Sequence, residues 1–296
     1  VWFNSTSNVL KGLAATTAGA WATGGSMGTA RNALGSAGTQ TAALGFGGQP
    51  GNTVNTELYN GTSWTEVNNL STGRNGIAGA GTSTSALGFG GEGSSPNPKN
   101  ETELWNGTNW TEVNNLNTAG KYKGSAGASN TAALSFTGIG PDNSNPVTNV
   151  ELWNGTNWTE TTDVNTARDN LAGSGTSTSA IAIGGAPNRA ITEKWNGSNW
   201  TEVGDLNNGR GSLAATAQDA TNALAFGGTS PIVGDTEIWN GTNWTETTNL
   251  STARSALGGA GIYTAAIAFA GQNPTPQTAT EEFTGAGPVT KTFDDS

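Results

Sequence analysis

The chain has 296 residues, no cysteine, no histidine, a formal net charge of −10 and only 11% charged residues. Its twelve Lys and Arg residues are spread along the chain, so a nucleic-acid partner is not expected, because phosphate binding requires a concentrated basic surface. No apolar run is long enough to cross a membrane. Without cysteine the chain has no disulfides, thiolate metal sites or cysteine nucleophiles. Eleven tryptophans argue against disorder, since disordered segments are poor in aromatic residues.

The first 20 residues, which begin VWFNSTSNVLKGL, are predicted to form an N-terminal hairpin with a turn near residues 5–8. The next segment, residues 21–25, begins with Trp21, which stands ten residues before Arg31. Trp64 stands ten residues before Arg74 in the same way. Residues 21–25 therefore read as the last strand of a repeat unit whose other strands do not precede it.

One unit recurs six times along the rest of the chain, beginning near Arg31, Arg74, Gly120, Arg168, Arg210 and Arg254. A Trp-Thr-Glu phrase marks five of the units, at spacings of 46, 48, 42 and 44 residues between Trp64, Trp110, Trp158, Trp200 and Trp244. A period in the low-to-mid forties is typical of a four-stranded propeller blade, and no 3.6-residue apolar period supports a helical repeat.

Each unit is predicted to contain four strands, which we name a to d. Strand a has small residues, as in GSAGTQ, and suits the crowded centre of a ring. Strand b is apolar on both faces and ends in a glycine pair, as in TAALGFGG, which is typical of a strand buried between blades. Strand c alternates polar and apolar residues and ends in Asn-Gly, as in TELYNG, so we expect a tight turn into strand d, which carries Trp-Thr-Glu.

These strands predict an all-β fold, a six-bladed β-propeller over residues 21–296. The sixth unit has Pro288 where the strand d tryptophan is expected. Residues 21–25 are expected to supply the missing strand and close the ring, because an open propeller would expose strand edges. Residues 289–293 could compete for the same edge, and the sequence leaves this choice open. The strand d tryptophans are expected to pack between blades, although partly exposed indoles could also serve as platforms for sugars.

The double glycine of ALGFGG, the aromatic residue of TELYNG, a Trp five residues later and an Arg ten residues after that resemble a Kelch-type β-propeller repeat, over about residues 21–293. Thr137, Ala270 and Gly120 depart from that pattern. The phrase NGTNWTEVNNLNTA, with the opening VWFNSTSNVLK, resembles repeat tracts in tail-fibre and other virion-surface proteins of marine bacteriophages. Kelch-type relatives include a copper radical oxidase, but its metal site needs Cys and His, which this chain lacks.

Comparison of the units indicates where a ligand would bind. The connection between strands c and d hardly changes, whereas the b–c connection differs in every unit, for example QPGNTVN, EGSSPNPKNE and APNRAI. Variable loops on a rigid scaffold are the usual location of a binding surface. In a propeller the b–c and d–a connections emerge on the same face, so the b–c loops would form the binding face.

The d–a connections would present a ring of cations around the channel mouth on that face. Its members are the ligand-binding candidates Arg31, Arg74, Arg168, Arg210 and Arg254, with Lys121 in place of the arginine missing at position 120. Such a ring would bind anions or sugars, since guanidinium groups grip carboxylates and hydroxyls. The alternative is that each arginine pairs with a neighbouring carboxylate or caps backbone carbonyls.

No catalytic residue, metal site or cofactor is expected. The glutamates of Trp-Thr-Glu and of Thr-Glu-Leu could be read as glycosidase pairs, but near-identical carboxylates in every unit do not make the one asymmetric site that catalysis needs. They are better explained as solvated strand positions or salt-bridge partners. A calcium site at Asp142, Asn143 and Asn145 would lack a bidentate acid.

The sequence and its resemblances together predict a non-enzymatic binding or adhesion module on a phage virion, in a tail fibre or decoration, which contacts host surface glycans through the b–c loops. Its expected partners are a host glycan or other virion proteins, without nucleic acid or membrane insertion, at the virion surface or in an extracellular location. One alternative is a structural virion or extracellular protein that assembles with copies of itself and has no specific ligand. Another is a glycan hydrolase, which would require one functional carboxylate pair.

Overall fold

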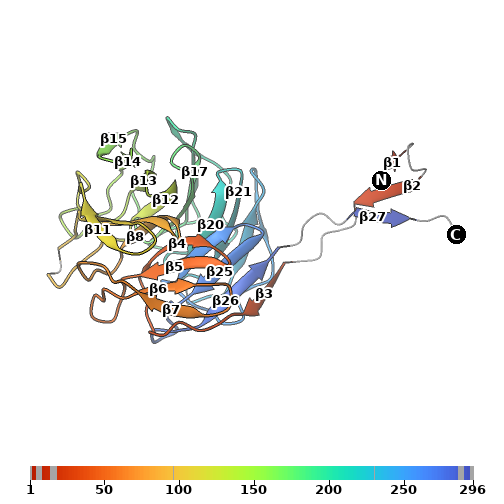
Figure 1. Ribbon diagram of the computed structural model, residues 1–296. Helices are drawn as coiled ribbons and strands as arrows, with labels where there is room; N and C mark the ends of the chain where they lie inside the picture. The colour runs from red at the N-terminus through yellow and green to blue at the C-terminus, as the bar shows by residue number, and fades with distance from the viewer. Residues whose placement is uncertain are drawn as a thin grey trace.

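The computed structural model describes residues 2–4, 9–13, 19–95, 97–229, 231–285 and 290–293. Every helix or strand assigned within these residues is a β-strand, and the strands form six four-stranded sheets and one three-stranded sheet. The four-stranded sheets are the blades of a ring, and their strands a contact one another at its centre (Figure 1). The predicted all-β, six-bladed β-propeller is confirmed.

The four strands of each blade fall where the repeat predicts them. Strand a is β4 (Gly35–Thr39), β8 (Ala78–Thr82), β12 (Gly124–Ser129), β16 (Ala172–Gly175), β20 (Ala214–Asp219) and β24 (Gly258–Ile262). Strand b is β5 (Ala42–Phe46), β9 (Ser85–Phe89), β13 (Ala132–Phe136), β17 (Ala180–Ile183), β21 (Asn222–Phe226) and β25 (Ala265–Phe269). Strand c is β6 (Thr56–Tyr59), β10 (Thr102–Trp105), β14 (Val150–Trp153), β18 (Thr192–Trp195), β22 (Thr236–Trp239) and β26 (Thr280–Thr284). Strand d is β7 (Trp64–Val67), β11 (Trp110–Val113), β15 (Trp158–Thr161), β19 (Trp200–Glu202), β23 (Trp244–Glu246) and β3 (Ala20–Thr23).

Small residues let the six strands a approach one another. A Cβ atom on Gly79 of β8 would lie 2.5 Å from the carbonyl oxygen of Ser36 on β4, so a larger residue there would push the two backbones apart. Each strand a contacts the next in this way around the whole ring. The low side-chain volume of strand a therefore sets how tightly the ring closes.

Aromatic rings join strand b of one blade to strand d of the next. The indole of Trp110 in β11 lies 4.8 Å, centroid to centroid, from the ring of Phe46 in β5 of the preceding blade. Equivalent contacts join Trp158 to Phe89, Trp200 to Phe136, Trp21 to Phe226 and Trp64 to Phe269. Such pairs contribute about 0.5–1.5 kcal/mol each beyond their buried area. The prediction that these tryptophans pack between blades is confirmed.

The connection between strands c and d is a four-residue loop rather than the tight turn that Asn-Gly favours. Pairing of β6 with β7 leaves residues 60–63 in the loop of the first blade. The Oδ1 atom of Asn60 accepts hydrogen bonds from the backbone N–H groups of Thr62 and Ser63, both at 2.9 Å. Gly61 takes a positive φ of 90°. The asparagine therefore caps the loop with its side chain, which explains why it recurs before each glycine.

The ring is closed by the segment that begins near Trp21, as predicted. β3 pairs with β26, and Trp21 lies opposite Phe283. The indole Nε1 of Trp21 donates a 3.2 Å hydrogen bond to the hydroxyl of Thr236 in the preceding blade. The N-terminal strand, and not residues 289–293, completes the last blade.

The two ends of the chain form a separate three-stranded sheet (Figure 1). β1 (Trp2–Asn4) pairs with β2 (Val9–Leu13), which is the predicted hairpin within residues 1–20, while its predicted turn lies outside the described residues. β27 (Thr290–Phe293) pairs with the other edge of β2. The predicted propeller boundary of 21–296 is therefore too long at its C-terminal end, because β3 already occupies the outer edge of β26.

The connections between strands lie on two opposite faces. On one, which we call the loop face, b–c loops contact d–a loops, as when the N–H of Leu70 donates to the carbonyl of Val54 at 3.0 Å. On the other, the turn face, a–b turns lie beside c–d loops. The N–H of Gly285 donates to the carbonyl of Thr264 in an a–b turn at 2.8 Å. The chain therefore leaves the propeller on the turn face, opposite the variable b–c loops.

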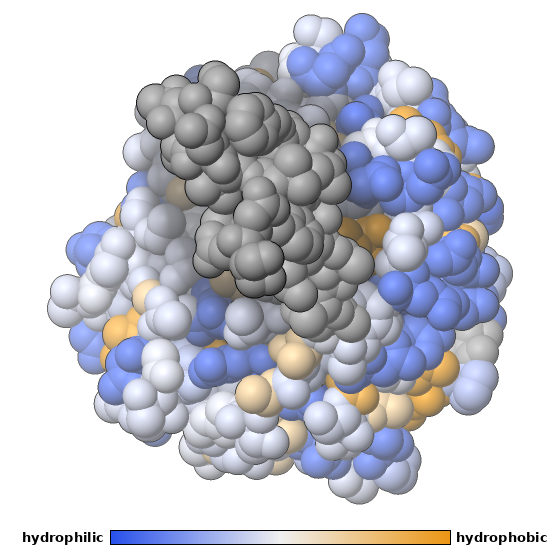
Figure 2. Space-filling model, turned by 90° about the vertical axis from the view of Figure 1, so that its right-hand side faces the viewer, coloured by the Kyte–Doolittle hydropathy of each residue, from blue (hydrophilic) through white to orange (hydrophobic). Residues whose placement is uncertain are grey.

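Figure 2 views the molecule from the right-hand side of Figure 1, where β3 and β26 lie. On the uncovered part of this face hydrophilic and neutral residues dominate, and hydrophobic residues form only small, separate patches. Scattered surface patches of this kind need no special explanation.

Candidate functional site

The five arginines predicted to form a ring at the channel mouth are buried instead. Their exposed fractions are 2% or less at Arg31, Arg74, Arg168, Arg210 and Arg254. Each pairs with the strand c glutamate of its own blade, respectively Glu57, Glu103, Glu193, Glu237 and Glu281. The predicted exposure of these arginine side chains at the channel mouth is therefore wrong. Each arginine instead makes the alternative contact, an ion pair with a neighbouring carboxylate.

The pair in the second blade illustrates what these arginines hold together. The Nη2 atom of Arg74 lies 2.8 Å from Oε1 of Glu103. Its Nη1 donates to the carbonyl oxygens of Gly90 and Glu101 at 2.9 and 2.7 Å. The second carboxylate oxygen of Glu103 accepts the N–H of Ser71 at 2.7 Å. Burial lowers the pKa of Arg74, and the charge of Glu103 acts in the opposite direction. Through these contacts the pair joins the d–a loop to the end of strand b and to strand c.

Lys121 does not replace the arginine missing at Gly120. It pairs with Glu92 of the preceding blade, and its ammonium lies 5.6 Å from the ring centroid of Tyr122. The side chain of Lys121 is 14% exposed, whereas the five arginines of the predicted ring are buried. Of the six predicted site residues, Lys121 is the most exposed.

The cation missing at Gly120 is supplied by Lys123, a position that holds leucine or isoleucine in the other units. The Nζ atom of Lys123 lies 3.2 Å from the point that a Cβ on Gly120 would occupy. Burial lowers the pKa of Lys123 to about 8, while the charge of Glu151, the strand c glutamate of this blade, acts in the opposite direction. Nζ is buried and has no hydrogen-bond partner among the described residues. Lys123 is therefore buried, as the arginines of the other blades are.

A closed ring of backbone hydrogen bonds surrounds the axis at the loop face. Each of its six members follows the Arg position by two residues and donates its N–H to the carbonyl of the member in the preceding blade, at 2.7–3.2 Å. The members are Ala33, Gly76, Tyr122, Asn170, Ser212 and Ala256, all with φ between 51° and 56°. A left-handed conformation is costly for residues other than glycine and persists where the surroundings impose it. Here the hydrogen-bonded ring imposes it.

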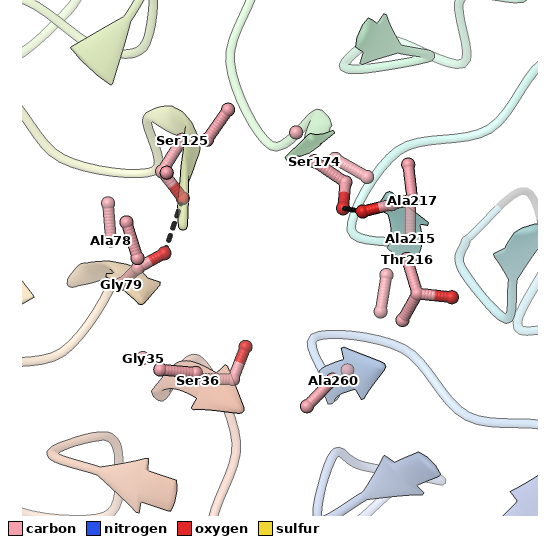
Figure 3. Close-up of a pocket in the computed structure, with 18 of the residues that line it drawn as sticks. Gly35, Ser36, Ala78, Gly79, Ser125, Ser174, Ala215, Thr216, Ala217 and Ala260 are labelled. Atoms are coloured by element: carbon pink, nitrogen blue, oxygen red, sulfur yellow. Dashed lines mark hydrogen bonds between the residues drawn. The ribbon is translucent and has the colours of Figure 1, made fainter. Parts of the chain in front are cut away.

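Within the ring of strands a lies a cavity of about 200 Å³. Figure 3 shows the strands around it, with glycine, alanine and serine at its wall. The hydroxyl of Ser125 donates to the carbonyl of Gly79 at 2.8 Å. Among the described residues that line the cavity only Lys123 is charged. The cavity therefore offers no pair of groups for acid–base catalysis.

A second cavity of about 90 Å³ lies at the loop-face end of the axis, and we call it the axial mouth. Its inner layer is aliphatic except for Lys123 and contains Leu34, Ile77, Leu171, Leu213 and Leu257. Its outer layer is the hydrogen-bonded ring. Polar side chains in this layer are confined to three successive blades and belong to Tyr122, Asn170 and Ser212.

These polar side chains form a local network. The hydroxyl of Tyr122 donates to Oδ1 of Asn75 at 3.2 Å, and burial raises the pKa of Tyr122. The hydroxyl of Ser212 donates to Oδ1 of Asn170 at 3.4 Å. The amide of Asn170 donates to Asp169 at 2.7 Å. A few polar groups converging on an aliphatic floor is the usual make-up of a small-ligand site.

The sequence prediction missed the residues of the axial mouth. They occupy the two positions between the repeated Arg and the repeated Leu, which read Asn-Ala, Asn-Gly, Lys-Tyr, Asp-Asn, Gly-Ser and Ser-Ala in chain order. These positions differ in nearly every unit, whereas their neighbours are Arg and an aliphatic residue in every unit but the third. That contrast was visible in the sequence and would have identified them.

A groove of about 330 Å³ lies on the loop face, between the d–a loop that enters the fifth blade and the b–c loop of that blade. We call it the blade-5 groove. Its walls are Asn207, Asn208, Gly209, Arg210, Val233 and Asp235. Unlike the axial mouth, it is lined mainly by polar side chains.

The glutamates considered as glycosidase pairs do lie opposite one another. Glu57 pairs in register with Glu66 across β6 and β7, but Glu57 is engaged by Arg31 while Glu66 is exposed. The same register recurs in four other blades. Among the described residues, no group of three or more His, Cys, Asp and Glu is placed to hold a metal ion. The described part of the chain also contains no helix long and apolar enough to span a membrane.

No family model matches the chain, and neither does any curated protein. Among solved structures 361 chains are similar. One of them, the structure of YjhT, superposes with a TM-score of 0.74 at 10% sequence identity, over 91% of this chain and 99% of that one. At this identity the likeness shows the propeller fold alone, since one fold hosts many functions. The resemblances to Kelch repeats and to phage tail fibres stay predictions.

Proposed function

We propose that the protein is a non-enzymatic binding module of a virion or other extracellular surface, and that its loop face binds a hydroxyl-rich ligand such as a host glycan. The observation that carries the proposal is the pattern of variation at the axial mouth. Five of the six units share the buried Arg–Glu pair, and the partly or fully exposed residues that differ between units gather around the axis and in the b–c loops. Variation on a fixed scaffold is typical of a recognition surface.

The frame beneath this surface is rigid. Buried Arg–Glu pairs fix the d–a loops, and the ring of six backbone hydrogen bonds fixes the residues of the axial mouth. A ligand that binds here would not need to order the backbone, which reduces the entropic cost of binding.

The chemistry of the axial mouth suits a sugar better than an anion. The arginines that could have bound a carboxylate ligand are already paired with glutamates of the protein, as Arg31 is with Glu57. The chain also carries a net charge of −10. What the mouth offers instead is a phenol, an amide and a hydroxyl above a floor that is aliphatic apart from the buried Lys123. A sugar ring has hydroxyls at its edge and C–H groups on its face, and this combination complements both.

The path of the chain fits display on a larger particle. Residues at both ends of the propeller lie on the turn face, because Gly285 contacts Thr264 in an a–b turn and Ala20 pairs with Thr284. Anything attached through the chain ends would therefore leave the loop face free to meet a ligand. This geometry supports a tail-fibre or decoration module, as its sequence resemblance implies.

The proposal is tested with a glycan array and a host-cell binding assay, comparing the wild type with Asn170→Ala/Ser212→Ala. Alanine already occupies the same left-handed position at Ala33 and Ala256, so the variant should fold normally. We expect it to bind at least about tenfold more weakly, since each lost hydrogen bond contributes roughly 0.5–1.5 kcal/mol.

The matched control is Thr84→Ala, which removes an exposed hydroxyl on the turn face and should bind as the wild type does. A folded wild-type protein that binds neither the array nor host cells would overturn the proposal. Equal loss in the control variant would show that the loop face is not the binding surface.

A further inference from the structure

The blade-5 groove differs from the equivalent places in the other blades. Asn208 stands where the other five units have threonine, for example Thr29 and Thr72. Both Asn207 and Asn208 are exposed, and Asp235 faces them from the b–c loop. The fifth blade thus carries two adjacent amides and a carboxylate in one groove of about 330 Å³.

The backbone beneath these side chains is held by the buried ion pair of the blade. The N–H of Asn207 donates to Oε2 of Glu237 at 2.8 Å. Arg210 pairs with the same glutamate and also donates to the carbonyl of Asn208 at 3.1 Å. The two amides therefore project from a fixed loop, and a ligand would meet them already in place.

The polar groups of the groove are only weakly engaged within the protein. The side-chain amide of Asn207 has no hydrogen-bond partner among the described residues. At the same repeat position Asn117 donates to Glu151 at 2.9 Å and to the carbonyl of Trp158 at 3.1 Å. The amide of Asn207 is thus available to a ligand, whereas its counterpart in the third blade is not.

The carboxylate of Asp235 also makes only weak hydrogen bonds within the described residues. It accepts hydrogen bonds from the amides of Asn208 and Asn249, both at 3.4 Å, well beyond the usual 2.9–3.0 Å. An ionised carboxylate can accept about four hydrogen bonds, so two or more positions are open to donors from a ligand. Asp235 repels an anion, and the buried pair next to it is already neutralised, so a neutral ligand rich in O–H groups fits best.

We propose that the blade-5 groove is a second subsite for a neutral, hydroxyl-rich ligand such as a sugar residue, with Asp235 accepting from its hydroxyls and Asn207 and Asn208 donating to them. This inference rests on the proposed function and assigns part of the same loop face. Ser212 at the axial mouth is the fourth residue after Asn208, so their Cα atoms are at most about 14 Å apart. A short oligosaccharide spans that distance, and contacts at both ends raise its affinity through effective concentration.

The test is chemical-shift mapping on the full ¹⁵N-labelled chain, titrated with the neutral methyl glycosides of glucose, galactose and mannose and with their trisaccharides. We expect the side-chain NH₂ signals of Asn207 and Asn208 to shift together with that of Asn170. The variant Asn208→Thr/Asp235→Asn carries residues that other units have at these positions, as in Thr29 and Asn55, so it should fold. It should bind the trisaccharide at least about tenfold more weakly, because hydrogen bonds to a charged group are the stronger ones.

The matched control is Asp163→Asn, which removes the same charge from an exposed position elsewhere and should bind as the wild type does. Shifts at Asn170 without shifts at Asn207 and Asn208 would overturn the second subsite and leave the proposed function standing. Groove shifts produced by calcium chloride alone and reversed by a chelator would also overturn it, in favour of a cation site. Failure of every glycoside, array glycan and host cell to bind the folded protein would overturn both proposals.

Discussion

The indole nitrogen of Trp200 is buried in the same cluster as Val150 and has no hydrogen-bond partner among the described residues. In the other five blades the strand d indole donates to the threonine hydroxyl that begins strand c of the preceding blade. The distances are 3.0 Å at Trp64, Trp110, Trp158 and Trp244 and 3.2 Å at Trp21. Val150 occupies the threonine position of the third blade and offers no acceptor.

We predict that Val150→Thr stabilises the protein. A buried hydroxyl normally costs free energy, but here it can accept a hydrogen bond from the unpaired indole N–H of Trp200. The hydrogen bond gained contributes about 1 kcal/mol. The free energy of unfolding from urea titration measures the change. Val113→Thr is the control, since Thr161 already fills that strand d position in the third blade, and it should change stability by less than about 0.5 kcal/mol. A Val150→Thr variant no more stable than the wild type would show that the hydroxyl does not reach Trp200.

The fold was predictable because its signals are local and repeated. Small residues in strand a, apolar residues in strand b and the ten-residue spacing from Trp21 to Arg31 each recur from unit to unit, so comparison of the chain with itself was enough. The closing strand followed from one missing tryptophan at Pro288. The sequence left the partner of the C-terminal strand open, because pairing between distant chain ends leaves no local pattern.

The candidate site was less predictable because its partners lie far apart in sequence. Arg31 meets Glu57, 26 residues away, and the period-2 pattern of strand c gives no sign that this glutamate is buried. The missing arginine at Gly120 is visible in the sequence, and the adjacent Lys121 is the cation that the repeat pattern predicts in its place. The structure shows that the cation moved three positions, to Lys123, where an aliphatic residue was expected.

The exchange at Gly120 and Lys123 should behave as one coupled change. Gly120→Arg alone would place its Cβ 3.2 Å from the ammonium of Lys123 and bring two buried cations together, so it should destabilise the protein. Gly120→Arg with Lys123→Leu restores the pattern of the other blades and should be at least as stable as the wild type. A double-mutant cycle should give a coupling of roughly 1–3 kcal/mol. If the stability changes of the two single variants added up to that of the double variant within about 0.5 kcal/mol, Lys123 would not be the counterpart of the arginine missing at Gly120.

Lys123 should also make the stability of the protein depend on pH. Burial lowers the pKa of Lys123 from 10.5 to about 8 in the folded protein. Between these values the unfolded chain holds a proton that the folded chain has released, so this group makes stability rise with pH across that window. The stability advantage of the Gly120→Arg/Lys123→Leu variant should therefore shrink between pH 7 and pH 10. An advantage that stays constant over this range would show that Lys123 does not lose its proton in the folded protein.

The buried pair of Arg74 and Glu103 should be essential to its blade. Arg74→Met leaves the carboxylate of Glu103 buried without its cation, which should cost about 3–5 kcal/mol. The control is Lys99→Met, because the ion pair of Lys99 with Glu101 is partly exposed and 4.0 Å long, and it should change stability by less than about 1 kcal/mol. Urea titration of both variants makes the comparison. Similar small losses in both would mean that backbone hydrogen bonds, and not the ion pair, hold the d–a loop.

The last prediction concerns closure of the ring. Trp21 is the N-terminal member of the interblade series and contacts Phe226 and Phe283, each at a centroid distance of 5.1 Å. If β3 is a full member of the last blade, Trp21→Ala should cost about 3–5 kcal/mol, the same as Trp158→Ala in the middle of the chain. Hydrogen exchange should also show the amides of residues 20–23 protected as well as those of β15. A small loss for Trp21→Ala beside a large loss for Trp158→Ala would mean that the closing strand detaches before the ring unfolds, and that the other five blades hold the propeller without it.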